Sequence, residues 1–245
     1  MEHFAGESIF RLGILNVTNT LLNTLLTDLI IFSLVFFIAK NLKSLPNLFQ
    51  SGVELIVEWF YSLTETISEK NTGKIFPYFM TFFIFILIAN WTGILPGVGS
   101  IGFFEDDRLI PLFRGATTDL NTTLALALIS AVATHTMSIR TIGIKDYLSR
   151  YFSFNPINLF IGALEIISEI TKIISLSFRL FGNIFAGEMV LITVAGIFAF
   201  LFPIPFLLLE IIVGLVQALV FSMLTMVFMA VLSTPHGEHA KEVSH

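Results

Sequence analysis

The sequence predicts an all-α integral membrane protein with about five membrane-embedded helices, one interfacial amphipathic helix, and a long, steeply inclined hairpin formed by the last two helices. Three observations predict this class. Hydrophobic residues make up 55% of the 245 residues, and charged residues only 13%. Several apolar runs are about 20 residues long, which is enough to cross a hydrocarbon core of about 30 Å as helices. We expect residues 1–245 to form a single membrane domain, because the sequence shows no internal repeat.

Composition excludes several classes of function. The formal net charge is -5 and no basic stripe is present, so we expect no nucleic-acid partner. Cysteine is absent, which excludes disulfides, thiolate metal sites and a cysteine nucleophile. The sequence lacks a GxxxxGK[ST] phosphate loop. The histidines of the polar tail, 233–245, are irregularly spaced, which favours a flexible tail over a metal site. We therefore expect no cofactor and no metal.

The first half of the chain predicts one membrane span and one interfacial helix. The apolar run 21–39 is the first predicted span, and two lysines follow it. In 46–74, apolar residues recur at steps of three and four but alternate with glutamates, so this segment is too polar to cross a membrane. We predict an amphipathic helix that lies at the interface, with membrane lipid as its neighbour.

Two further spans are predicted, and the positive charges beside the spans indicate the orientation of the chain. They cover 75–95 and 119–139, and the Gly- and Pro-rich stretch 93–102 ends the first of them. Lys and Arg are concentrated around 40–74 and 140–150, whereas the alternate sides carry only three arginines. The positive-inside bias then places the N-terminus outside and the C-terminus in the cytoplasm.

The last two helices, 157–202 and 203–232, are predicted to pack as a hairpin. About 40 helical residues would extend about 60 Å, twice the hydrocarbon core. The first of the two helices must therefore tilt steeply, bend, or break near Gly196. Two prolines open the returning helix.

Arg179 lies inside the apolar run SLSFRLFGNIFAGE, 175–188. A charge at the bilayer centre costs about 3 kcal/mol or more, so it must face a partner or a water-filled cavity. Four polar residues share its helical stripe: Glu165, Lys172, Ser175 and Asn183. Glu169 can pair with Lys172, and mutual neutralisation within a helical bundle is the alternative interpretation of these charges. For His135, near the end of the third span, we favour a hydrogen-bonded core residue.

Glu188 lies on the opposite helical face from Arg179, so it must serve a different environment. An antiparallel hairpin that pairs Glu188 with Glu210 also pairs Arg179 with Gln217, and both pairings place the turn at 197–201. Two facing carboxylates in a low dielectric favour sharing of a proton, which predicts a proton relay. The carboxylate that Arg179 requires is expected to belong to another subunit.

These residues resemble subunit a of the F-type ATP synthase membrane sector. The resemblance rests on SLSFRLFGNIFAGE together with ATTDLNTTLALAL, 116–128, and LVQALVFSMLT, 215–225. It implies a stator beside a rotating ring of c subunits, with two offset aqueous half-channels and Arg179 as the essential arginine. It also implies a place on the ion path for the following residues: Asn183 and Gln217 beside the arginine, Glu188 and Glu210 on the outer side, Glu165 on the cytoplasmic side, and Asp119 and Asn121 at the polar entry of the preceding span.

The resemblance further implies partners and a location. We expect the c-ring, peripheral-stalk b subunits and the remaining ATP synthase subunits as partners, in the bacterial cytoplasmic membrane or, alternatively, the mitochondrial inner or thylakoid membrane. The chain would not be an enzyme on its own, and we expect it to carry protons. A self-contained ion-coupled transporter is the alternative function, and the absence of an internal duplication disfavours it.

Overall fold

The computed structural model describes residues 8–12, 15–95, 98, 101–105, 108–151, 156–197 and 203–234. Within this part of the chain, four helices are long and apolar enough to cross a membrane: α1 (Asn19–Lys40), α3 (Thr72–Ile94), α4 (Leu120–Ile142) and α7 (Pro203–Leu232). This arrangement confirms the predicted class, a multi-pass, all-α membrane protein.

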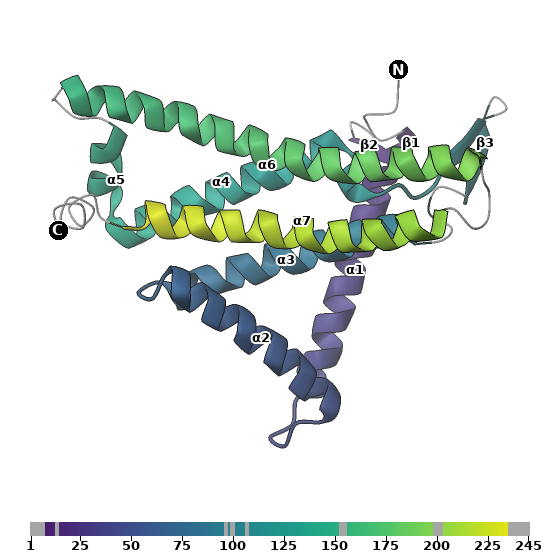
Figure 1. Cartoon of the computed structure of the whole chain (residues 1–245), viewed down its shortest axis with the longest axis horizontal. Helices are drawn as coiled ribbons and strands as arrows, with labels where there is room; N and C mark the ends of the chain where they lie inside the picture. Colours follow the sequence, from purple (N-terminus) through teal and green to yellow (C-terminus); the bar gives the residue numbers. More distant parts are fainter. Residues whose placement is uncertain are drawn as a thin grey trace.

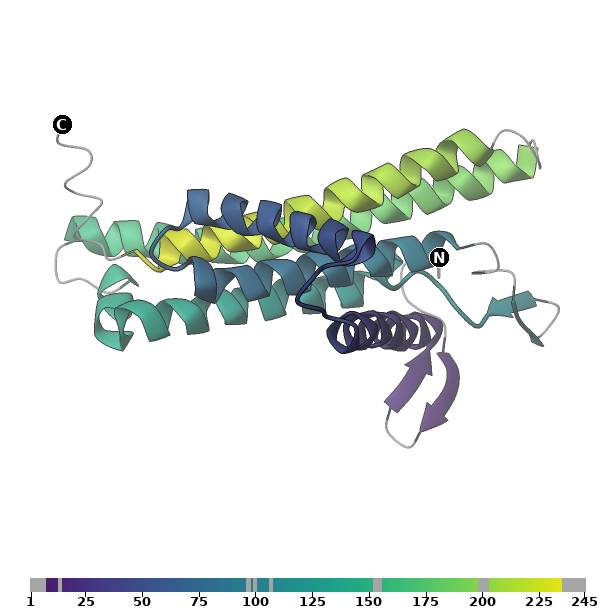
Figure 2. The same cartoon turned by 90° about the horizontal axis from the view of Figure 1, so that it is seen from below.

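The longest helix is α6 (Pro156–Ile197), which runs for 42 residues without a break. It is unbroken from Pro156 through Gly196 to Ile197, where the described part of the helix ends. Helix α7 packs beside α6 and runs back in the opposite direction (Figure 1). Of the turn predicted at 197–201, residues 198–201 lie outside the described residues. Helix α1 crosses the long helices steeply, whereas α3, α4, α6 and α7 lie roughly along one another (Figures 1 and 2).

Two helices flank this group. Helix α2 (Leu48–Ile67) is amphipathic and packs its buried face, at Phe60 and Thr64, against α3. Helix α5 (Ile144–Tyr151) was not predicted from the sequence. It follows Gly143, whose positive φ of 87° turns the chain sharply after α4. This short helix is important for the site because it covers the beginning of α6.

Small elements at the other end of the molecule were also not predicted. Strands β1 (Ser8–Leu12) and β2 (Leu15–Thr18) pair antiparallel, with Ser8 opposite Thr18. Strands β3 (Gly102–Glu105) and β4 (Arg108–Pro111) form a second antiparallel pair. The 3-10 turn η1 (Ala116–Thr118) leads from the second pair into α4. These two short hairpins are minor additions to a helical membrane protein, and the all-α class still describes it.

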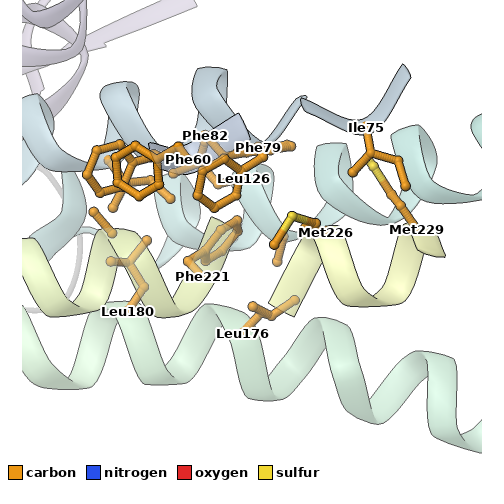
Figure 3. Packing of buried hydrophobic residues seen from close by; sticks show 14 of the residues in the cluster. Phe60, Ile75, Phe79, Phe82, Leu126, Leu176, Leu180, Phe221, Met226 and Met229 are labelled. Carbon is orange, nitrogen blue, oxygen red and sulfur yellow. The ribbon is translucent and has the colours of Figure 1, made fainter. Parts of the chain in front are cut away.

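The core lies where α3, α4, α6 and α7 meet (Figure 3). It is built from aromatic, Met and branched side chains, including Phe79, Phe221, Ile86, Met226 and Met229, none of which exposes more than 1% of its surface. Phe60 brings α2 to this core through ring contacts of 5.2 Å with Phe79 and 4.8 Å with Phe83. The core holds α7 firmly against α3, so the polar residues of α7 have fixed positions for α6 to meet.

Candidate functional site

Arg179 lies on the face of α6 that points away from the core. Its side chain is exposed, and its only hydrogen bond in the described part of the chain is a long one, 3.4 Å from Nη2 to Ser175 Oγ. The same face also exposes Ser175, Gly182, Asn183 and Ala186. The opposite side of the helix buries Leu176, Leu180 and Ile184 in the core. Helix α6 therefore presents an arginine, flanked by small and polar residues, on an open surface.

Asn183 and Gln217 connect this face to α7. Asn183 Nδ2 donates a hydrogen bond of 2.8 Å to Gln217 Oε1, and Gln217 is buried. The sequence argument had paired Gln217 with Arg179. The structure instead pairs it with Asn183, one helical turn further along α6, and leaves the guanidinium of Arg179 outside the helix pair.

Glu188 and Glu210 come together further along the same two helices. Glu210 is 7% exposed and its carboxylate lies against Gly187, the neighbour of Glu188. The two carboxylates interact electrostatically. In each of them Oε2 is buried and makes no hydrogen bond within the described residues. A pair of incompletely satisfied acids in a membrane protein marks a candidate functional site.

Arg114 is a member of this acid cluster that sequence reasoning missed. Its Nη2 lies 4.0 Å from Glu188 Oε2, and its side chain is mostly buried. The residue belongs to the irregular segment between β4 and η1, where no periodicity predicts which way a side chain points. The position of its segment beside α6 is a tertiary result, so no local signal could have found the contact.

Asp119 begins α4 and holds it to α1. Its Oδ1 accepts a hydrogen bond of 2.9 Å from the Asn121 backbone N–H, and Thr20 Oγ1 donates one of 3.0 Å to Oδ2. The Asp119 carboxylate is thus an N-cap and an interhelical link. The side chain of Asn121, by contrast, is exposed.

A cluster of buried polar residues extends from Asp119 along α1 and α3. It contains Asn19, Thr20, Asn23 and Thr27 from α1, Asn90 and Thr92 from α3, and Thr117 from η1, and it is linked by the Thr20–Asp119 and Thr27–Thr92 hydrogen bonds. Both amide atoms of Asn23, and Oδ1 of Asn90, are buried without a hydrogen-bond partner in the described residues. Asn90 Nδ2 donates to Gly214 O of α7 at 2.9 Å, which brings the cluster within one turn of Glu210. The steps of four between Asn19, Asn23 and Thr27 were the sequence signal for this face.

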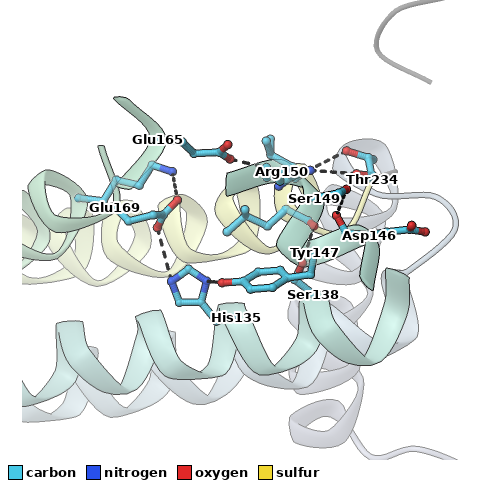
Figure 4. A network of polar contacts seen from close by, with 12 residues as sticks. His135, Ser138, Asp146, Tyr147, Ser149, Arg150, Glu165, Glu169 and Thr234 are labelled. Carbon is cyan, nitrogen blue, oxygen red and sulfur yellow. Dashed lines mark hydrogen bonds and ion pairs between the residues drawn. The ribbon is translucent and has the colours of Figure 1, made fainter. Parts of the chain in front are cut away.

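The remaining candidates gather at the other end of α6, next to α5 (Figure 4). Lys172 Nζ lies 2.7 Å from Glu169 Oε1, which confirms the predicted pair. His135 approaches the second oxygen of Glu169, at 3.8 Å. Glu165 Oε1 lies 3.7 Å from Nε of the buried Arg150, a partner that the sequence did not indicate. No group of three or more His, Asp or Glu residues in the described ranges is arranged to hold a metal ion.

Comparison with known proteins assigns this arrangement to a family. Residues 21–230 match the family model described as ATP synthase A chain. The chain belongs to the ATP synthase A chain family. The matched region contains all of the site residues described above, from Arg114 to Gln217.

Relatives across nearly the whole chain agree with this assignment. The chain is 33% identical to the ATP synthase subunit a of Moorella thermoacetica over 230 residues, which cover 94% of this chain and 97% of the relative. It is 33% identical to an ATP synthase subunit a of Pelobacter propionicus, over 91% of this chain and 90% of the relative. Identity to the ATP synthase subunit a of Legionella pneumophila is 30%, over 94% and 92% respectively.

Proposed function

We propose that this chain is the stator subunit a of an F-type ATP synthase, and that it conducts protons through two half-channels that meet a ring of c subunits at Arg179. The observation that carries the proposal is the exposure of Arg179 on a helix of the membrane sector. An unpaired guanidinium is too costly to face lipid. A partner surface that brings a carboxylate to it accounts for both its exposure and its single weak internal hydrogen bond.

The chemistry at the contact between Arg179 and a partner's carboxylate follows from the properties of the guanidinium group. Arginine stays charged at any physiological pH, so it favours the ionised form of an approaching carboxylate and drives its proton away. It also keeps protons from passing directly along this face. The small residues Gly182 and Ala186 leave room for a helix of the ring to approach closely.

The outer half-channel is proposed to run from the polar cluster around Asp119 and Asn121 to Glu210 and Glu188. Both amide atoms of Asn23 and Oδ1 of Asn90 are buried without a hydrogen-bond partner in the described residues, and internal water typically satisfies such atoms. Glu210 and Glu188 continue this route on the hairpin and pass the proton toward the partner carboxylate at Arg179, past the hydrogen-bonded Asn183–Gln217 pair.

The cytoplasmic half-channel is proposed to open at the α5 end of α6, near Glu165. Orientation follows the positive-inside bias, with the N-terminus outside, in a bacterial cytoplasmic membrane. The proposed partners are the c-ring, the peripheral-stalk b subunits and the other ATP synthase subunits. Since the chain has no phosphate-binding loop, nucleotide chemistry is assigned to those other subunits.

Replacement of Arg179 in the intact complex tests this proposal. Arg179→Ala should abolish ATP-driven acidification of inverted vesicles while the complex still assembles, and Arg179→Lys should also fail because it lacks the planar guanidinium. Thr171→Val is the matched control, since Thr171 is exposed on the same helix and bonds only the Ile167 carbonyl oxygen. Pumping retained by Arg179→Ala would refute the proposal and favour a self-contained transporter.

A further inference from the structure

At the α5 end of α6, four side chains from three helices form a connected polar group. Glu169 and Lys172 lie on α6, His135 on α4 and Tyr147 on α5 (Figure 4). Lys172 Nζ contacts one oxygen of Glu169 at 2.7 Å, and His135 Nε2 lies 3.8 Å from the other. His135 Nδ1 is hydrogen-bonded to the Tyr147 hydroxyl at 2.9 Å. We call these four residues the His135 group.

The His135 group adjoins a small cavity between α4, α6 and α7. The cavity has a volume of about 10 Å³, room for about one water molecule. Its wall includes the hydroxyls of Ser130 and Thr134 together with Glu169 and Lys172. Leu176 and Phe228 close the apolar side, and the Lys172 ammonium lies 4.8 Å from the centre of the Phe228 ring. A water molecule in this cavity would find hydrogen-bonding partners in Glu169, Lys172 and the two hydroxyl side chains.

The group connects the neighbourhood of Arg179 with the aqueous surface. Lys172 and Ser175 are on the same stripe of α6 as Arg179, and Glu169 lies about 15 Å from Arg179 along the helix. At the other end, the side chain of His135 is 28% exposed and Tyr147 belongs to the largely exposed helix α5. The polar residues therefore lead from the membrane interior to the end of the molecule that carries Arg140 and Lys145.

Glu165 is less suited than Glu169 to connect the neighbourhood of Arg179 with the aqueous surface. Its carboxylate contacts Arg150, whose side chain is 4% exposed and also donates to the Thr234 carbonyl oxygen at 3.1 Å. Breaking such a pair would leave a buried guanidinium without its counter-charge. Glu165 is thus paired with a cation that the packing of α5 on α6 buries, whereas Glu169 lies between a lysine and an imidazole.

We infer that Glu169 and His135 form the proton-release relay of the cytoplasmic half-channel, with Tyr147 and Lys172 as positioning residues. This inference rests on the proposed function. A proton arriving through water binds a Glu169 oxygen and forms the neutral acid. Because 3.8 Å is longer than a hydrogen bond, the acid transfers the proton through one bridging water to His135 Nε2, which restores the carboxylate and forms imidazolium. The imidazolium releases a ring proton to water at the exposed side of α4 and returns to the neutral ring.

The charged and titratable groups around His135 are compatible with this cycle. Helix α6 presents Glu169, with Lys172 bound to it, and α5 presents Tyr147, whose ring makes an edge contact with that of Tyr151 at 5.3 Å between ring centres. Burial raises the pKa of Tyr151, so this phenol stays neutral. The single ionisable residue of α7, Glu210, lies near Gly187 at the opposite end of the hairpin. An imidazole ring can accept a proton at one nitrogen and release one from the other.

The test compares passive proton conductance of membranes that contain the assembled complex and are stripped of its soluble part. His135→Gln keeps a polar side chain but cannot take up a proton, so conductance should fall about tenfold and lose its dependence on inner-side pH near neutrality. Tyr147→Phe removes only the hydrogen bond to Nδ1 and should cause a smaller loss. Thr171→Val serves as the control that remains at the wild-type rate.

A double replacement separates a relay from mere charge balance. Glu169→Gln alone leaves the Lys172 charge unbalanced, so it changes the charge balance as well as proton transfer, whereas Glu169→Gln with Lys172→Gln restores neutrality. If the pair only balances charge, the double variant should conduct like wild type, and this result would overturn the inference. If Glu169 is a proton carrier, the double variant should stay about tenfold slow. Unchanged conductance and pH profile in His135→Gln would also overturn it.

These outcomes are independent of the test of the proposed function. If Arg179→Ala stops pumping while the His135 and Glu169 variants conduct normally, the relay inference alone is wrong. If Arg179→Ala still pumps, the stator role itself is wrong, whatever the relay variants do.

Discussion

Gly187→Ala is a substitution whose effect on the proton path can be worked out from the structure. A Cβ atom at Gly187 would lie 3.1 Å from Oε1, 3.3 Å from Cδ and 3.5 Å from Cγ of Glu210. Ordinary contacts begin at 3.4 Å, so the carboxylate must move by about 0.3 Å. Misplacement of a reacting group by 1 Å can cost about 100-fold in rate, and a shift of this size scales to about fourfold.

The same substitution should not weaken the fold. Alanine in a helix interior is favoured over glycine by about 1 kcal/mol, so α6 gains helical stability while the Glu210 carboxylate is displaced. We expect normal assembly and thermal stability together with proton flux reduced about fourfold, measured as ATP-driven pumping and as passive conductance. Gly196→Ala is the control, because a Cβ there meets no atom of the described residues within 4 Å.

A double variant tests whether the contact of the new methyl group with Glu210 causes the reduced proton flux. Glu210→Asp shortens the side chain by one methylene and removes the overlap with a new methyl group at Gly187. Gly187→Ala should then add no further loss in the Glu210→Asp background, since the two changes act on one contact. If the losses simply multiply, or if Gly187→Ala pumps like wild type, the reasoning from this contact is refuted.

Two further predictions concern the structural links of the site. Asp119→Ala removes the N-cap of α4 and its link to Thr20, so the free energy of unfolding should fall by about 1–2 kcal/mol, whereas Asp119→Asn should keep most of the cap; thermal unfolding of the purified complex distinguishes them. Arg150→Met leaves Glu165 without its cation and frees the Thr234 carbonyl oxygen, so it should expose the α5–α6 junction to proteolysis; an unchanged cleavage pattern would contradict a structural role for this pair.

The sequence is informative about the helices because membrane insertion leaves few alternatives to them. Backbone groups in lipid must be satisfied within the segment, so apolar runs of sufficient length become helices. Hydropathy marked the run that forms α7, and the lack of a stop signal marked the unbroken α6. Helix α5 and the two β hairpins lie outside that constraint. They are short and depend on a glycine turn and on tertiary contacts, which no periodicity reveals.

The contacts of the candidate site are likewise of two kinds: some join residues close in the sequence, and others join residues far apart in it. The pair Glu169–Lys172 could be predicted because residues three apart on a helix are neighbours. The contacts of Glu188 with Arg114 and of Glu165 with Arg150 could not, because each arginine lies outside the long helices and reaches its acid only after the chain has packed. The angular position of Arg179 was predictable, and its exposure required the packing of α6 on α4 and α7.

The register of α6 gives a physical reason for keeping the two proposed proton paths apart. Glu169 and Glu188 are 19 residues apart, or about 28 Å along the helix, close to the thickness of the hydrocarbon core. Both acids turn toward neighbouring helices, whereas Arg179, between them, turns outward. On the core side between them, Leu176, Leu180 and Ile184 offer a proton no acceptor, and the buried hydroxyl of Ser177 is already hydrogen-bonded to Thr123 at 3.2 Å. On the outward face, Arg179 repels a proton unless a partner's carboxylate carries it past.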